Sequence, residues 1–267
     1  MTGFLIVNPR SGHRRGDELL APAAARGIAT HVLQEGEDVV AVARSSDADA
    51  IGVAGGDGSL APVAAVAIER DVPFVCVPAG TRNHFARDLG LDRDDPVAAL
   101  DAFTRGTERR IDVGRVNDRY FLNNVSLGLY ARLVRRREHN RRRNEALARA
   151  RALGAVALHR NPVEITVDGR PIEARVVLVS NNPYELEMLS IGERLRLDEG
   201  VLHLYVPLGL FRSTWDDRPC DRLTIDASTH RLSAAIDGEP EVLATPLEFR
   251  IEAAALRVLV PARENGS

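Results

Sequence analysis

The stretch Ala50-Ile51-Gly52-Val53-Ala54-Gly55-Gly56-Asp57-Gly58-Ser59 joins a short apolar run to a glycine-rich turn, and the helical pattern Leu60 to Arg70 follows at once. A short apolar run that ends in turn residues is typical of a buried strand. A strand, a glycine turn and a helix in direct succession indicate one βα unit of a parallel sheet. This unit decides the fold class of the first part of the chain.

The same alternation extends to both sides of this unit. Helical patterns at 17–26, 39–44 and 60–70 separate the apolar runs, and alternation of this kind predicts an α/β domain with a parallel sheet and helices on both faces. The expected strands are Phe4 to Val7, Thr30 to Leu33, Ala50 to Ala54 and Pro73 to Val77.

From about residue 107, short strand patterns follow one another with turns between them, which predicts a mainly antiparallel β-sandwich domain. We place an α/β domain at 1–108 and a β-rich domain at 109–254, interrupted by a basic helical insertion near 128–158. The closing strand 255–261 is a candidate to complete the first domain. The expected strands are 109–116, 119–125, 163–167, 172–180, 201–206, 222–226, 232–236, 247–251 and 255–260.

Composition excludes several classes of protein. The 267 residues are 45% hydrophobic and 27% charged with a net charge of -3, which is typical of a globular chain and not of a disordered one. Two cysteines exclude a disulfide scaffold, and they lack the paired spacing of a zinc site. Every basic residue is arginine, so a Walker-type phosphate loop and Schiff-base chemistry are excluded. With neither a signal peptide nor an apolar run of spanning length, we expect a cytoplasmic protein.

The glycine turn Gly55 to Ser59 carries the sharpest chemical signal. Consecutive glycines let the backbone approach a ligand closely, and the helix that follows offers free N–H groups to phosphate. Asp57 would be unfavourable beside phosphate unless it binds a bridging Mg²⁺ or accepts a proton. A tight turn with a surface aspartate is the alternative reading of this motif alone.

Two further polar loops are expected at the same edge of the sheet, because they also follow strands. Asn8 to Gly12 follows the first strand, and Gly80 to Asn83 follows the fourth. Ligands of open α/β sheets bind beyond the carboxyl ends of the strands, so three such loops predict a pocket. Arg10 and Arg14 are candidates to supply its positive charge, or else solvated surface residues.

The motifs resemble, in order and spacing, the catalytic domain of the diacylglycerol kinase family, which bacterial lipid kinases and sphingosine kinases share. NAD kinases and phosphofructokinases are more distant relatives. The resemblance covers nearly the whole chain. It rests on Asn8-Pro9 with Ser11-Gly12, Gly55 to Ser59, Pro78 to Gly90, Asn123 to Gly128, Leu197 to Gly200 and Asp237 to Pro240.

The resemblance implies ATP and Mg²⁺ as cofactors, with Asp57 organising Mg²⁺ and the phosphates. It implies Glu239 as the base that accepts the proton of the lipid hydroxyl, with Asp57 as second candidate. Without the family, Asp237-Gly238 would be read as a hairpin turn. The implied ATP-binding residues are Asn8, Pro9, Arg10, Ser11, Gly12, Gln34, Gly55, Gly56, Asp57, Gly58, Ser59, Leu60, Ala61, Pro62, Gly80, Thr81 and Asn83.

A structural Mg²⁺ site is implied at Leu197 to Gly200, formed by Glu199 with the carbonyls of Arg196 and Val201. Relatives usually carry Asp where this chain has Glu199. The longer side chain puts closure around a small octahedral ion in doubt.

The helical stretch Arg132 to Arg151 holds nine arginines and two glutamates. Such a helix can attract anionic lipid headgroups, and a solvated helix is the alternative. The net acidic chain argues against nucleic acid as a partner. We therefore expect peripheral contact with the inner membrane surface, and we leave a homodimer open.

The sequence as a whole predicts an ATP-dependent lipid kinase, a phosphotransferase with an alcohol acceptor that serves phospholipid biosynthesis. The expected reaction is transfer of the γ-phosphoryl group to the hydroxyl of a diacylglycerol-like lipid. The alternatives are a kinase for a soluble acceptor, as in NAD kinases, and a catalytically silent nucleotide or lipid sensor. No motif here identifies the acceptor.

Overall fold

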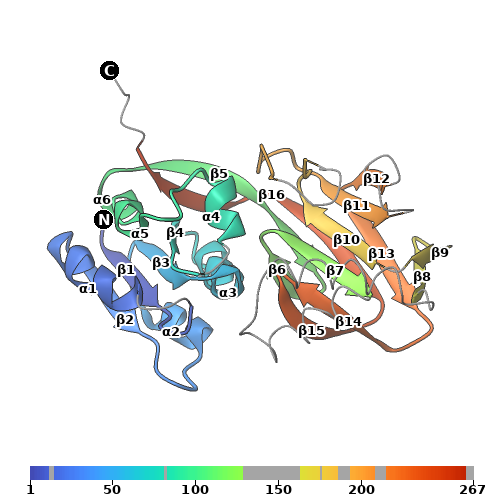
Figure 1. The fold of residues 1–267 in the computed structure, drawn as a ribbon, viewed down its shortest axis with the longest axis horizontal. Helices are drawn as coiled ribbons and strands as arrows, with labels where there is room; N and C mark the ends of the chain where they lie inside the picture. The colour runs from blue at the N-terminus through green and yellow to red at the C-terminus, as the bar shows by residue number, and fades with distance from the viewer. Residues whose placement is uncertain are drawn as a thin grey trace. The chain divides into compact units, whose positions relative to one another are not determined.

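The computed structural model describes residues 1–11, 15–80, 83–128, 163–174, 176–185, 193–207 and 215–262. The chain divides into two compact units, the first formed by Met1–Val113 with Ala253–Ser267 and the second by Gly114–Glu252. Two long strands, β5 (Gly106–Val116) and β16 (Leu247–Pro261), run from one unit into the other (Figure 1). The expected basic helix near 128–158 falls almost entirely within 129–162, outside the described residues.

The first unit is built on a parallel sheet with the strand order β2-β1-β3-β4-β16. The C-terminal part of β16 pairs in parallel with β4, Val258 beside Phe74. The elements that begin in this unit are β1 (Gly3–Val7), α1 (Arg15–Ala25), β2 (Ile28–Val32), α2 (Val39–Ser45), β3 (Ala50–Gly55), α3 (Asp57–Glu69), β4 (Phe74–Pro78), α4 (His84–Asp88), α5 (Pro96–Ala99), α6 (Ala102–Arg105) and β5 (Gly106–Val116).

Helices cover both faces of this sheet because its inner strands are apolar on both sides. All six residues of β3 are buried. One face packs Leu5 and Ala54 against Leu19 of α1 and Phe103 of α6. Alternate strand residues point to the opposite face, where α3 contacts β3 and α2 packs on α3.

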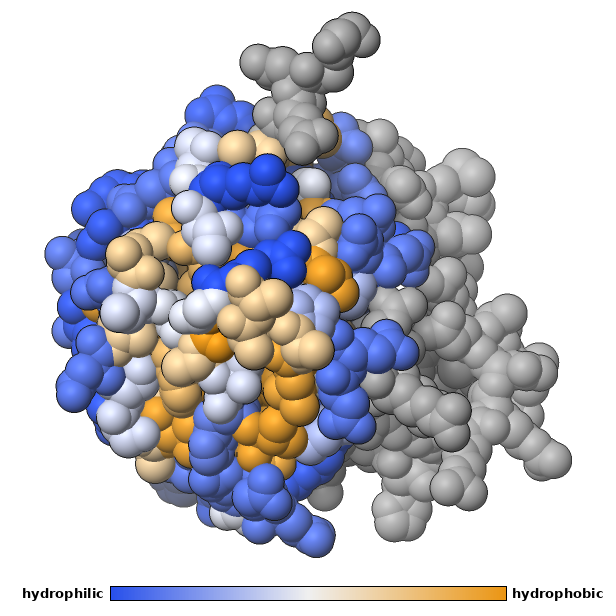
Figure 2. Space-filling view, turned by 90° about the vertical axis from the view of Figure 1, so that its left-hand side faces the viewer, coloured by the Kyte–Doolittle hydropathy of each residue, from blue (hydrophilic) through white to orange (hydrophobic). Residues whose placement is uncertain are grey.

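The edge of the first unit that carries α1 and β2 has a mixed surface. Figure 2 shows small groups of apolar side chains there, separated by charged and polar ones. Strand β2 agrees with this view, because Ala29 and Thr30 are exposed whereas Ile28 is buried. The apolar residues that hold the unit together thus lie mainly in its interior.

The second unit packs two antiparallel layers around one core. One layer is the six-stranded sheet β12-β11-β10-β7-β14-β15, and the other contains β13, β8, β9 and the first part of β16. Within this core the rings of Phe121 and Phe249 pack edge to face, with their centres 6.3 Å apart. The remaining strands are β6 (Arg119–Phe121), β7 (Asn124–Gly128), β8 (Val163–Val167), β9 (Arg170–Ala174), β10 (Val176–Asn181), β11 (Leu202–Pro207), β12 (Trp215–Cys220), β13 (Arg222–Ala227), β14 (Arg231–Ile236), β15 (Glu239–Ala244) and β16 (Leu247–Pro261).

The predicted fold class is confirmed: an α/β part with a parallel sheet, followed by a mainly antiparallel sandwich. Several predicted boundaries are wrong. The strand expected at 119–125 is broken at 122–123, where the backbone turns to bind a buried carboxylate described below. The residues expected as one strand at 172–180 belong to two strands, β9 and β10, whereas 247–251 and 255–260 belong to one strand. Helix α3 begins at Asp57 rather than Leu60, so the glycine turn is shorter than expected.

Candidate functional site

Two glycines bring the loops after β3 and β4 into backbone contact. A Cβ placed on Gly80 would lie 2.4 Å from the Cα of Gly56, closer than such atoms approach in proteins. The amide of Ala79 donates to the carbonyl of Gly55 at 3.3 Å. Only a residue without a side chain fits at position 80, so the close approach of the two loops depends on this glycine.

The loop after β1 joins the same place through Asn8. Its Nδ2 donates to Oγ of Ser59, in the first turn of α3, at 2.9 Å. Its Oδ1 accepts from the amide of Arg10 at 3.0 Å, and the guanidinium of Arg10 donates to the Gln34 carbonyl at 3.2 Å. The three loops expected from the sequence therefore converge on the N-terminus of α3, and Arg10 ties the loop after β2 to them.

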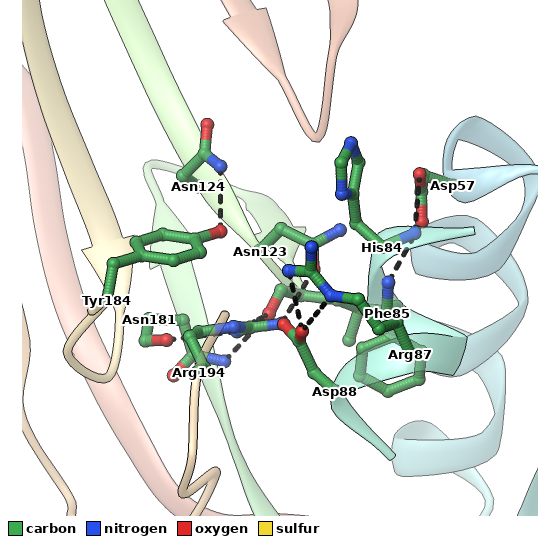
Figure 3. Close-up of polar contacts among 11 residues, drawn as sticks. Asp57, His84, Phe85, Arg87, Asp88, Asn123, Asn124, Asn181, Tyr184 and Arg194 are labelled. Atoms are coloured by element: carbon green, nitrogen blue, oxygen red, sulfur yellow. Dashed lines mark hydrogen bonds and ion pairs between the residues drawn. The ribbon is translucent and has the colours of Figure 1, made fainter. Parts of the chain in front are cut away.

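Asp57 has a structural task that the sequence reasoning missed. It is the first residue of α3, and its Oδ2 and Oδ1 accept from the amides of His84 and Phe85, each at 3.2 Å (Figure 3). The carboxylate therefore caps the first turn of α4. Each oxygen keeps further acceptor capacity, because a carboxylate offers about four lone-pair positions.

Asn83 shapes the segment between Gly80 and α4. It adopts a left-handed backbone with φ 49° and is 4% exposed. Its carboxamide accepts from the Gly80 amide and donates to the Gly80 carbonyl, both at 2.9 Å. Asn83 therefore acts as a clamp on the loop backbone. Thr81 lies outside the described residues, as does Gly12 of the first loop.

The remaining nucleotide candidates differ in their accessibility. Leu60 and Ala61 are 1% and 8% exposed, so their side chains pack inside the unit. Gln34 and Pro9 are exposed. The half-buried candidates are Asn8, Ser11, Gly56, Asp57, Gly58, Ser59, Pro62 and Gly80.

Cys76 lies in β4 next to these loops and is 2% exposed. Burial raises the pKa of its thiol well above the ordinary value, and the charge of Asp57 acts in the same direction. The thiol therefore stays protonated at neutral pH and is not a nucleophile of this site.

In the second unit, Asp237 and Gly238 form the two-residue turn that joins β14 to β15. Both have positive φ, 49° and 88°, and Ile236 pairs with Glu239 across the turn. Positive φ at both central residues is the pattern of a tight hairpin with Asp-Gly. The hairpin reading of this motif is therefore confirmed. Glu239, the candidate base, follows this turn as the first residue of β15, and it is exposed.

The carboxylate of Asp237 is held by three consecutive backbone amides. Its Oδ2 accepts from Leu122 at 2.8 Å, and its Oδ1 accepts from Asn123 at 2.7 Å and from Asn124 at 3.0 Å. Asp237 is 8% exposed. Successive N–H groups that converge on one anion form a nest, which compensates the buried charge.

A buried guanidinium lies on the carbonyl side of the same segment. Arg194 is 2% exposed and donates to the Leu122 carbonyl at 2.6 Å and to Oδ1 of Asn123 at 2.6 Å (Figure 3). It also donates to the Asn181 carbonyl at 3.0 Å, and its Cζ lies 5.5 Å from the centre of the Tyr184 ring. Nothing in the sequence distinguishes this arginine from the many others in the chain, so sequence reasoning missed it.

The segment expected to hold a structural Mg²⁺ already contains a positively charged side chain, that of Arg196. The guanidinium of Arg196 lies 3.1 Å from Asp198 and 4.0 Å from Glu199. The amide of Glu199 donates to Oδ1 of Asn182, which fixes the backbone there. Within the described ranges, no group of three acidic, histidine or cysteine side chains could hold a metal ion. The donor set at Arg196, Glu199 and Val201 therefore has one carboxylate, already beside a guanidinium.

Residues 2–116 match the family model of the diacylglycerol kinase catalytic domain. The expected resemblance to the diacylglycerol kinase family is confirmed. That stretch contains the three loops and Asp57, whereas Glu239 and the segment 196–201 lie beyond it.

Curated relatives agree with the family model. The chain is 35% identical over 127 residues to the diacylglycerol kinase of Mycobacterium tuberculosis, 42% of this chain and 40% of that protein. It is 33% identical over 130 residues to the diacylglycerol kinase of Bacillus subtilis, 45% of this chain and 43% of that protein. The matched stretch thus spans about two fifths of the length of these relatives.

The fold is shared over almost the whole chain. A crystal structure of a diacylglycerol kinase from Bacillus anthracis superposes with a TM-score of 0.72 and covers 97% of this chain and 96% of its own. The sequence identity is 21%, so this likeness establishes the fold and not the activity. Among the described residues, no helix is long and apolar enough to cross a membrane.

Proposed function

We propose that this protein is an ATP-dependent lipid kinase that phosphorylates the hydroxyl of a diacylglycerol-like lipid. One observation carries the proposal: loops from β1, β3 and β4 converge on the N-terminus of α3 within the stretch that matches the diacylglycerol kinase catalytic domain. A glycine-lined helix N-terminus offers N–H groups and partial positive charge to phosphate.

The phosphoryl donor is ATP, bound by the residues at this meeting point. The glycines at 56 and 80 let the two loops lie against each other, while Asn8 and Ser59 hold the loops in register. Arg10 supplies positive charge in a chain without lysine. Mg²⁺ supplied with the nucleotide would neutralise phosphate charge, and Asp57 is the carboxylate that these loops provide to bind it.

The acceptor hydroxyl loses its proton to the Glu239 carboxylate. The hydroxyl oxygen forms a bond to the γ-phosphorus, and the bond from that phosphorus to the bridging oxygen of ADP breaks, with its electron pair leaving on ADP. Glu239 suits this task because it is exposed at a hairpin end whose turn is anchored by Asp237. A positioned carboxylate base contributes about 10²–10⁴ in rate.

The acceptor is a lipid, and the enzyme reaches it by peripheral contact with the inner membrane surface. The support is the family match together with the nine arginines of Arg132 to Arg151, a stretch outside the described residues. Basic residues near an anionic surface each contribute about 1 kcal/mol of attraction.

A partition assay tests the acceptor class. Purified protein receives γ-labelled ATP and Mg²⁺ with either a cell-lipid extract in detergent micelles or an aqueous metabolite extract, and both phases are counted. We expect label in the organic phase, lost in Asp57→Ala. Label on a new aqueous metabolite would assign a soluble acceptor instead. ATP binding without transfer to either extract would make the protein a nucleotide sensor.

A further inference from the structure

A single peptide group in the second unit lies between two buried opposite charges. The carbonyl of Leu122 accepts from Arg194 at 2.6 Å, and the amide of Asn123, in the same peptide group, donates to Asp237 at 2.7 Å. Arg194 is 2% exposed and Asp237 is 8% exposed. A hydrogen bond on each side of a peptide group polarises that group and strengthens the other bond, most of all where water is excluded.

Arg194 also fixes the surroundings of this peptide group. It binds Oδ1 of Asn123 and the carbonyl of Asn181, and the Asn181 side chain donates to the same Leu122 carbonyl at 3.1 Å. Tyr184, whose ring lies beside the guanidinium, accepts from the Asn124 side chain at 3.0 Å. The break between β6 and β7 is therefore held on its carbonyl side by Arg194 together with the Asn181 side chain.

The amide side of the same break holds the hairpin turn. Asp237 accepts from all three amides of residues 122–124, and its own amide donates to the Asn124 carbonyl at 2.9 Å. Glu239 begins β15 two residues later. Any shift of the break would therefore be passed to the start of β15 through the Asp237 carboxylate.

We infer that Arg194 is a positioning residue for Glu239, acting through the Leu122–Asn123 peptide group and the Asp237 carboxylate. The inference rests on the proposed function, in which Glu239 takes the proton of the acceptor hydroxyl. Arg194 does not touch the reacting atoms in this scheme. It sets the place from which the base acts, since small displacements of a catalytic group lower the rate steeply.

The first test is independent of any activity. Hydrogen–deuterium exchange is followed in peptides that contain 122–124 and 237–239, for the wild-type chain and for Arg194→Met. We expect exchange at least about tenfold faster in both peptides of the variant, because the charge-assisted bonds are lost. The matched control is Arg218→Met, which removes an exposed arginine of the same unit that pairs with Asp216. Unchanged exchange at 122–124 in a folded Arg194→Met chain would overturn the inference, whatever the activity.

The second test separates positioning from general damage by kinetics. With a lipid acceptor, Arg194→Met should lower kcat at least about tenfold and leave KM for ATP within about twofold, since the ATP loops belong to the other unit. Arg194→Lys keeps the charge and should restore part of kcat. The double variant with Asp237→Asn should lose no more kcat than the worse single variant, because both act through one peptide group.

The outcomes distinguish the inference from the proposed function. If wild-type protein phosphorylates lipid and folded Arg194→Met keeps full kcat, the positioning role is wrong while the kinase proposal stands. If losses in kcat simply add in the double variant, the coupling through the peptide group is wrong. If wild-type protein phosphorylates no lipid, the kinase proposal fails together with this role for Glu239, and the exchange result still decides whether Arg194 holds the hairpin.

Discussion

Glu239 carries the proton transfer in the proposed reaction, so its substitution gives the sharpest test at the scale of one residue. Glu239→Gln keeps the size of the side chain but removes the base, and we expect kcat to fall by about 10²–10⁴ with KM for ATP unchanged. Steady-state kinetics with a lipid acceptor measure both. Glu241→Gln, on the same strand β15, serves as the control and should keep wild-type kcat. Full kcat in Glu239→Gln would remove the assigned base.

Asp57 caps α4 and also carries a negative charge. The variant Asp57→Asn, compared with the control Asp95→Asn, separates these two roles. Asp57→Asn keeps one acceptor oxygen for the amides of His84 and Phe85. We expect its free energy of unfolding to stay within about 1 kcal/mol of wild type, because Asn caps helices well. Transfer should fall at least about 100-fold, because the carboxylate charge is lost.

Asp95 offers a matched control for the cap at Asp57. It caps α5 by accepting from the Ala98 amide at 3.0 Å, and it has no place in the proposed mechanism. Asp95→Asn should therefore cost a similar amount of stability and leave kcat intact. An equal loss of activity in both variants would show that Asp57 acts only as a cap.

At the scale of elements, the contact between the loops after β3 and β4 depends on Gly80. A Cβ there would meet the Cα of Gly56 at 2.4 Å, which flexible side chains cannot relieve. We expect Gly80→Ala to destabilise the protein by about 1–3 kcal/mol and to abolish the thermal shift that ATP produces. Gly169→Ala is the control, with φ 75° and open space around it. It should cost about 1–2 kcal/mol of strain and keep the ATP shift.

The elements also show what could be predicted from the sequence. Apolar runs such as 50–54 and 73–77 predicted strands because burial on both faces leaves a continuous apolar pattern. The break at 122–123 was missed, because its cause is a carboxylate more than 110 residues away, at Asp237. The role of Asp57 as a cap was missed for the same reason, since His84 and Phe85 lie after the next strand. Local sequence patterns indicate secondary-structure propensity and hydrophobic periodicity. They do not indicate contacts between residues that are far apart in the chain, such as these.

At the scale of the whole chain, ion pairs join segments that are far apart in sequence, and Asp101 gives a pH prediction. Hydrogen bonds from Arg105 and then from Arg26 hold the pKa of Asp101 below its ordinary value of 3.8. A depressed folded-state pKa adds stability above the unfolded-state pKa, and this is lost as pH falls through the folded-state pKa.

The Asp101→Asn variant isolates this contribution. At pH 7 we expect it to be less stable than wild type by about 1 kcal/mol, because the pair is only partly exposed. The difference should begin to shrink as pH falls below about 3.8 and disappear only below the lowered pKa of the folded state. Denaturant melts at pH 7 and at low pH measure it, with the fully exposed Asp118→Asn as the control. A difference that grows on acidification would contradict the sign of the pKa shift.

One measurement tests the central claim most directly: transfer of label from γ-labelled ATP to a short-chain diacylglycerol in mixed micelles, with and without Mg²⁺. The account predicts a labelled phosphatidate-like product from wild-type protein, none without Mg²⁺ and none from Asp57→Ala. Failure to label the lipid in a protein whose melting temperature rises with Mg·ATP would contradict the account, because the nucleotide site would then be present without the proposed reaction.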